Sequence, residues 1–133
     1  MSDVYQRIVP IMADVLAIDE DEVRPDASLI KDLGAESIDM LDLVFRLERE
    51  FKVKIPRGQM EIDARGGLSA EEFEHRGVVT EQGMGALREY FAEVPAERFK
   101  ASMKVAEIAT LFTVETFCKV VQRALDKQQA VSS

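Results

Sequence analysis

The sequence predicts an all-α fold, a helical bundle with an additional, mostly helical insertion. Apolar residues recur at three- and four-residue spacing in 3–17, 37–51 and 113–125, which is the period of an amphipathic helix. Hydrophobic residues make up 47% and charged residues 32% of the 133 residues, which fits one globular domain and excludes a disordered or collagen-like chain. We expect a single domain over 1–133, with a core at about 3–56 and 97–126, an insertion at about 57–96 and a frayed tail at 127–133.

The first predicted helix covers residues 3–17. Its apolar positions follow helical spacing, and Ser2 or Asp3 can cap its first turn. Pro10 lies too deep for a first-turn proline and removes a hydrogen bond to the carbonyl of Gln6, so we expect a kink or a late helix start.

Residues 18–36 predict a long ordered loop. They combine an acidic run at 19–22 with Pro25, Ser28 and Gly34, and long loops in compact domains are often functional. The run has the charge of a calcium-binding loop but lacks the glycine at its sixth position and has Pro25 near it. We therefore predict no metal site.

The second predicted helix covers 37–51, which contains no glycine or proline and precedes an extended-looking stretch at 52–56. Its apolar positions are too many for one stripe. The band expected to face the core is Leu43, Val44, Leu47 and Phe51. Leu41 and Phe45 follow Ser37 at i+4 and i+8 on another side, which makes that side a candidate binding surface.

Several capping signals predict helices after residue 57. Ser69 and Glu72 have the spacing of a capping box, and Thr80 can cap a helix that runs toward Pro95, although Gly83 and Gly85 weaken it. We also expect a helix over 97–109. Thr113 is the expected cap of the last helix.

The chain is acidic. Seventeen basic residues against 25 acidic residues give a formal net charge of −8, which repels nucleic-acid phosphates and anionic lipid surfaces and predicts basic protein partners. No apolar run is long enough to span a bilayer, the start lacks the pattern of a signal peptide, and the single Cys118 cannot form an internal disulfide. We expect a cytoplasmic monomer without nucleic-acid binding or membrane insertion, in which Cys118 is a small buried filler.

Catalysis by side chains is hard to build from this sequence. His75 is the only histidine, so a Ser37–His75 hydrolase would depend on it alone, and nothing marks an oxyanion hole or a second base. The polar surroundings of His75 predict a solvated surface imidazole. We therefore expect no enzyme and no catalytic residue.

Ser37 stands where the predicted loop meets the second helix. One interpretation is a simple N-cap, whose hydroxyl accepts a first-turn amide. That interpretation does not explain its neighbours, which are Gly34 before it, Leu41 and Phe45 below it, and the acidic residues Asp39, Asp42 and Glu48 along the same helix.

The segment 32–39, Asp-Leu-Gly-Ala-Glu-Ser-Ile-Asp, together with the helix after it and the Ile-Pro at 55–56, resembles the acyl carrier protein family. Leu-Phe-Thr-Val-Glu at 111–115 is similar to the family's entry to its last helix, and the resemblance covers about 3–56 and 103–126. It implies an acyl-carrier-like four-helix bundle. It also implies that Ser37, flanked by Gly34, Glu36 and Asp39, carries a covalent 4′-phosphopantetheine arm received from coenzyme A.

The same resemblance implies a partner-binding surface. Its expected members are Asp39, Leu41, Asp42, Phe45 and Glu48. The expected partners are a phosphopantetheinyl transferase and an acyl-ACP synthetase, ketosynthase or acyltransferase with basic docking patches. The implied function is to carry acyl intermediates as thioesters in specialised fatty acid, lipid or polyketide-like biosynthesis; an aminoacyl or peptidyl carrier and an armless carrier-like interaction protein are the alternatives.

Three features depart from the family pattern. Glu36 replaces the usual aspartate before the serine, and Arg46 and Arg49 interrupt a helix that is commonly more uniformly acidic. The third is the insertion of about forty residues after the second helix. We expect its large apolar residues to pack beside the acyl channel and either to enlarge that channel or to add a partner surface, and a tolerated surface elaboration is the alternative. These residues are Met60, Ile62, Phe73, Met84, Leu87, Tyr90, Phe91 and Phe99.

Overall fold

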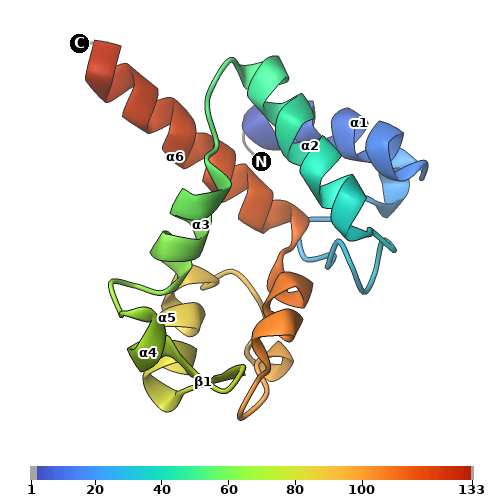
Figure 1. Ribbon diagram of the computed structural model, residues 1–133. Coiled ribbons are helices and arrows are strands. Elements are labelled where there is room, and N and C mark those ends of the chain that lie inside the picture. Colours follow the sequence, from blue (N-terminus) through green and yellow to red (C-terminus); the bar gives the residue numbers. More distant parts are fainter. Residues whose placement is uncertain (1–2, 133) are drawn as a thin grey trace. The chain divides into compact units, whose positions relative to one another are not determined.

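The computed structural model describes residues 3–132, apart from the side chains of 57–59, 61 and 129–132. The chain divides into two compact units. We call Met1–Ile55 together with Thr113–Ser133 the main unit, and Pro56–Phe112 the inserted unit. Helices dominate both units and the described sheet has only two short strands, which confirms the predicted all-α class (Figure 1).

Three α-helices build the main unit: α1 (Asp3–Leu16), α2 (Ser37–Phe51) and α6 (Val114–Ser132). A 3₁₀ turn, η1 (Glu20–Glu22), lies in the long segment between α1 and α2. Helix α1 packs against both α2 and α6, and α2 also contacts α6 (Figure 1). The bounds of α2 agree with the predicted second helix.

The core of the main unit comes from the apolar stripe of each helix. The predicted band of α2 is buried, which confirms its orientation toward the core. Burying such aliphatic and aromatic side chains stabilises a fold by about 1.5–3 kcal/mol each. The buried helical residues are Val4, Ile8, Met12 and Ala13 of α1, Leu43, Val44, Leu47 and Phe51 of α2, and Val114, Phe117, Val120 and Val121 of α6.

Two expectations about helix ends are corrected. Helix α1 begins at Asp3 and continues through Pro10, so the late start does not occur. Pro10 and Gln6 are both exposed, so water can satisfy the carbonyl that the proline leaves without a donor. Helix α6 continues to Ser132, so the tail expected to fray from residue 127 is helical over 127–132. Ser2 and Ser133 lie outside the described residues.

The inserted unit has a hydrophobic core of its own. Its elements are α3 (Arg57–Ala64), α4 (Ala70–Phe73), β1 (Glu74–His75), β2 (Val78–Val79), α5 (Glu81–Tyr90), η2 (Ala96–Arg98) and η3 (Val105–Leu111). The predicted caps are present, because Ser69 accepts the amide of Glu72 and Thr80 accepts the amide of Gly83. The buried cluster is Ala64, Phe73, Val79, Met84, Leu87, Tyr90, Phe91, Val94, Met103 and Leu111.

A hairpin replaces part of the expected helical pattern. Strands β1 and β2 pair antiparallel around Arg76 and Gly77, whose φ angles of 53° and 81° are both left-handed, as a tight two-residue hairpin turn requires. The turn signal Arg-Gly is weak because arginine seldom adopts this conformation. This hairpin was not foreseen from the sequence.

The prediction of a helix over 97–109 is wrong. The segment forms the 3₁₀ turns η2 and η3, and the stretch between them adds to the hairpin. The amide of Val79 donates to the carbonyl of Met103 at 2.7 Å, and the amide of Val105 donates to Gly77 at 2.8 Å. Ser102 has a φ of 59°, which breaks any helix at that point. Pairing with the hairpin therefore overrides the helical spacing of the apolar residues.

The extent of the insertion also differs from the expected 57–96. Met103 and Leu111 are buried in the core of the inserted unit, so residues 97–112 belong with it and not with the core of the main unit. The expected boundary divides a core that is continuous from Ala64 to Leu111.

Two glycines of α5 have opposite surroundings. A β-carbon at Gly83 would collide with the carbonyl oxygen of Phe73 and lie 2.7 Å from Cγ1 of Val79. A β-carbon at Gly85 would meet nothing within 4 Å. Gly83 thus permits close packing of α5 on α4 and β2, whereas Gly85 only lowers helix propensity.

Replacing Gly83 with alanine should destabilise the inserted unit by about 1–3 kcal/mol, because its core has no room for the methyl group. Gly85→Ala is the matched control and should stabilise the unit by about 0.5–1 kcal/mol through helix propensity. Hydrogen–deuterium exchange of peptides from the inserted unit measures both effects. Equal protection in the two variants would contradict the packing role of Gly83.

Candidate functional site

Ser37 is the first residue of α2, and Glu36 is its N-cap. Glu36 has an extended backbone with φ −102° and ψ 169°, as an N-cap requires. The Ser37 side chain is exposed, and within the described residues its hydroxyl forms no hydrogen bond. The interpretation of Ser37 as a simple N-cap is therefore wrong, and the hydroxyl is available for chemistry.

Asp39 fixes the start of α2. Its carboxylate oxygen Oδ2 accepts the backbone amide of Glu36 at 3.0 Å, and the helical bonding begins with the amide of Met40 donating to the carbonyl of Glu36 at 3.0 Å. The amides of Ser37 and Ile38 precede this bond and have no intrahelical acceptor. The helix therefore presents free N–H groups and the positive end of its dipole beside the Ser37 hydroxyl.

The loop before Ser37 is held by hydrogen bonds within itself. Asp32 accepts the amide of Ser28 at 2.7 Å, and the amide of Ala35 donates to the carbonyl of Leu29 at 2.8 Å. Gly34 has a φ of 72°, a left-handed conformation that costs glycine little. These contacts fix the path of the chain over the residues that lead into Ser37.

The same loop is joined to the start of α6. Ser28 and Thr113 form an isolated antiparallel bridge, and the amide of Val114 donates to the carbonyl of Ala27 at 3.2 Å. Thr113 caps α6 as predicted, because its Oγ1 accepts the amide of Thr116 at 3.1 Å. Two secondary-structure elements therefore determine the position of Ser37: α2, which it begins, and α6, to which its loop is bonded.

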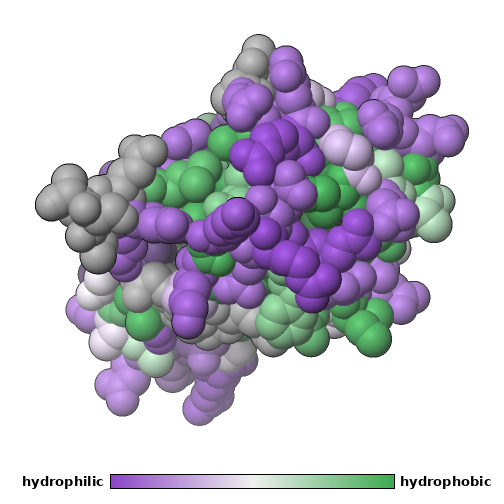
Figure 2. All heavy atoms as spheres, turned by 90° about the horizontal axis from the view of Figure 1, so that it is seen from above, coloured by the Kyte–Doolittle hydropathy of each residue, from purple (hydrophilic) through white to green (hydrophobic). Residues whose placement is uncertain are grey.

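An exposed apolar line runs along α2 from Ser37. Ile38 is 70% exposed and Phe45 is 56% exposed, while the Leu41 side chain is half-buried between them. Ile38 was missed from the sequence, although its seven-residue separation from Phe45 places both on one face of a helix. Figure 2 shows separate hydrophobic patches on a surface that is otherwise largely hydrophilic.

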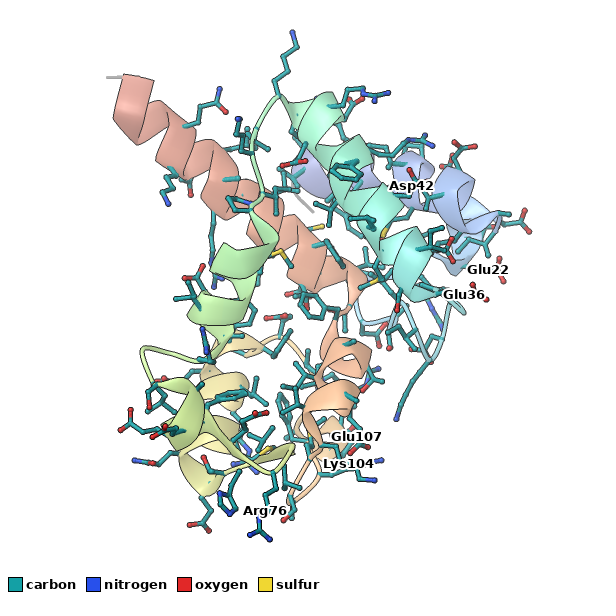
Figure 3. All side chains as sticks on the ribbon, viewed as in Figure 1. Glu22, Glu36, Asp42, Arg76, Lys104 and Glu107 are labelled. Atoms are coloured by element: carbon teal, nitrogen blue, oxygen red, sulfur yellow. The ribbon has the colours of Figure 1, made fainter. Side chains whose placement is uncertain are left out.

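The predicted acidic residues of this surface divide into two groups. Glu36 and Asp42 are exposed, and Figure 3 shows them at the beginning and in the first half of α2. Glu48 is half-buried, and its Oε2 accepts the backbone amide of Ile55 at 2.7 Å. Glu48 thus holds the segment after α2, while Asp42 and Glu36 present carboxylates to solvent.

Ion pairs neutralise part of the basic charge of the main unit. Arg46 pairs with Asp14 of α1 at 2.8 Å. Arg7 of α1 binds the carboxylate of Glu50 at 3.0 Å and lies over the ring of Phe51 at 4.2 Å. The Arg46 side chain therefore faces α1, although the sequence suggests that it interrupts an acidic recognition helix.

His75 and Cys118 are two further side chains with reactive groups. His75 is exposed on β1 in the inserted unit, which confirms the predicted solvated imidazole. Cys118 of α6 is half-buried, and burial, with the nearby charge of Glu115, raises the pKa of its thiol to about 12.

Among the described residues, no group of three or more acidic, cysteine or histidine side chains could hold a metal ion. Within the same described residues, no helix is long and apolar enough to cross a bilayer.

One family model matches the chain. It is described as "Phosphopantetheine attachment site" and matches residues 6–64, which is under half of the chain. The match includes α1 from Gln6 onward, the whole ordered loop, Ser37, all of α2 and the following segment through α3.

Gly34→Ala should destabilise the main unit by about 1–2 kcal/mol, because a β-carbon is disfavoured at a left-handed φ even where, as here, it meets no neighbouring atom. Gly34→Asn should destabilise the main unit less, since asparagine tolerates this conformation. Urea unfolding followed by far-ultraviolet circular dichroism gives both values. If the Gly34→Ala variant were as stable as the wild type, the loop would not need the left-handed conformation at Gly34.

Proposed function

We propose that the chain is an acyl carrier protein whose 4′-phosphopantetheine arm is attached to Ser37, because residues 6–64 match the model of a phosphopantetheine attachment site. Proteins of this family are carriers with a covalently bound 4′-phosphopantetheine group. The assignment of the arm to Ser37 depends on one observation above all: an exposed hydroxyl without an intramolecular hydrogen bond at the first position of α2.

The residues around Ser37 suit attachment of a phosphate ester. The hydroxyl oxygen would form the bond to phosphorus and lose its proton, while the pyrophosphate bond of coenzyme A breaks and adenosine 3′,5′-bisphosphate leaves. The hydroxyl must therefore reach an enzyme's active site, and its exposure at a helix end allows this. Free amides and the helix dipole favour a phosphate near the start of α2 by about 0.3–1 kcal/mol. The carboxylates of Glu36 and Asp42 repel the phosphate and so offset part of this gain.

The attached arm supplies a thiol, on which an acyl group is carried as a thioester. The chain itself has one thiol, Cys118, and its raised pKa keeps it protonated at neutral pH. A protonated thiol is a poor nucleophile, so Cys118 would not compete with the arm for activated acyl groups. We also propose that the cargo is acyl rather than aminoacyl or peptidyl, that the protein is cytoplasmic and that its role is non-catalytic.

The surface beside Ser37 suits brief contact with several enzymes. The apolar side chains of Ile38 and Phe45 provide a small contact area, and the carboxylates of Glu36 and Asp42 attract basic surfaces from a distance. We propose that a phosphopantetheinyl transferase, an acyl-ACP synthetase and a ketosynthase or acyltransferase bind here through basic docking patches. Such attraction weakens as salt is added, because these charges face solvent.

The inserted unit is proposed to add a partner surface rather than to line an acyl channel. Of the eight large apolar residues expected to pack beside the acyl channel, five are buried in the unit's own core. Those five are Phe73, Met84, Leu87, Tyr90 and Phe91. Phe99 packs partly against the same core, and Ile62 is 51% exposed on α3.

Intact mass measurement tests the attachment site. The protein is co-expressed with a broad-specificity phosphopantetheinyl transferase, and the wild type should gain the mass of one phosphopantetheine while Ser37→Ala gains none. Ser102→Ala removes another exposed serine hydroxyl and should leave the modification intact. An adduct on Ser37→Ala would exclude this site, and an unmodified wild type would favour the armless interaction protein.

The raised pKa of Cys118 predicts slow alkylation. Iodoacetamide at pH 8 should label the arm thiol of the modified protein quickly and Cys118 slowly, whereas both should react in denaturant, where a cysteine has a pKa near 8.5. Peptide mapping locates the label. Because the folded protein holds this proton more tightly, the contribution of Cys118 to stability should be lost as the pH rises from about 9 to about 12. Fast native labelling of Cys118 would contradict its burial.

A further inference from the structure

The exposed crest of α2 changes charge along its length. We define the crest as the exposed side chains that follow one another at four- and three-residue spacing and so lie along one line of the helix. In order they are Ile38, Asp42, Phe45, Arg49 and Lys52, the last at the C-cap. The half next to Ser37 is apolar and acidic, and the far half is basic.

The basic half of the crest is not neutralised by its neighbours. The adjacent carboxylate of Glu50 is bound by Arg7 at 3.0 Å, and Glu48 is bound to a backbone amide. Within the described residues, Arg49 and Lys52 form no ion pair. The helix dipole favours basic residues in a last turn, which explains why they are tolerated there. It does not require them to be exposed on the same line as Asp42 and Phe45.

The separation of the charges is large enough for a partner to distinguish them. At 1.5 Å per residue, Asp42 and Arg49 lie about 10 Å apart along the helix axis, with Phe45 between them. This distance is similar to the screening length at physiological ionic strength, about 8 Å, so each end attracts its own counterpart. A uniformly basic surface laid along the crest would meet Asp42 favourably and would place like charges against Arg49 and Lys52.

We propose that the crest binds an enzyme surface of matching polarity. That surface carries basic side chains beside the Ser37 end, an apolar seat for Ile38 and Phe45, and acidic side chains about 10 Å further along that meet Arg49 and Lys52. This inference rests on the proposed carrier function and refines its partner. The basic half of the crest discriminates against enzymes whose docking patch is basic throughout.

Three stapled helical peptides with an identical apolar face can test the match. One carries lysines at one end and glutamates at the other, the second carries the same residues interleaved, and the third carries lysines only. Each is titrated into protein whose phosphopantetheine arm has been verified by intact mass, and backbone amide NMR shifts give the dissociation constants at low salt. The segregated peptide should bind about fivefold more tightly than the lysine-only peptide, and more tightly than the interleaved one.

Arg49→Glu should abolish the preference for the segregated peptide. The control Lys127→Glu makes the same charge change at an exposed position of α6 and should keep the preference. Equal or tighter binding of the lysine-only peptide to the wild type, or an unchanged order of affinities in Arg49→Glu, would overturn the inference. Since the arm is verified beforehand, such a result bears on the crest alone, whereas failure to attach the arm bears on the carrier function.

Discussion

The junction between the loop before α2 and the first turn of α6 determines where the reactive end of α2 lies. Ser28, Thr113 and Thr116 are buried there, and they are the buried polar residues found within the described part of the chain. Ser28 bridges to Thr113, and the two threonines bond to each other at 2.9 Å. A buried polar group without a partner costs about 1–3 kcal/mol, so few alternative alignments of loop and helix retain these bonds. The path from Ser28 to Ser37 follows from this alignment.

The junction also marks the point where the chain returns from the inserted unit. Thr113 is the first residue after that unit, and its hydroxyl immediately caps α6. The inserted residues bury their own apolar side chains, among them Phe91 and Met103. The main unit therefore does not have to shelter the extra apolar surface. A local cap and a self-contained core explain how a long insertion fits between α2 and α6 while the surroundings of Ser37 stay ordered.

Local signals predicted much of this structure. The bounds of α2 and the caps at Ser69, Thr80 and Thr113 depend on neighbours within four residues, which a sequence displays directly. The turns over 97–109 could not be predicted, because they depend on pairing with a hairpin more than twenty residues away. At the site, the place of Ser37 at the start of the second helix and the exposure of Phe45 could be predicted from the spacing of apolar residues along that helix. The actual cap, Glu36, and the binding of Glu48 to the chain after α2 required three-dimensional contacts.

The division of the core between two units has a spectroscopic consequence. The chain contains two tyrosines and no tryptophan, and each unit contains one tyrosine. Tyr90 is buried in the core of the inserted unit and packs edge-to-face on Phe91, while Tyr5 donates to the carbonyl of Val23 in the main unit. Single-tyrosine variants would therefore give each unit its own intrinsic fluorophore. The two signals would report whether the units melt as one cooperative system or as two.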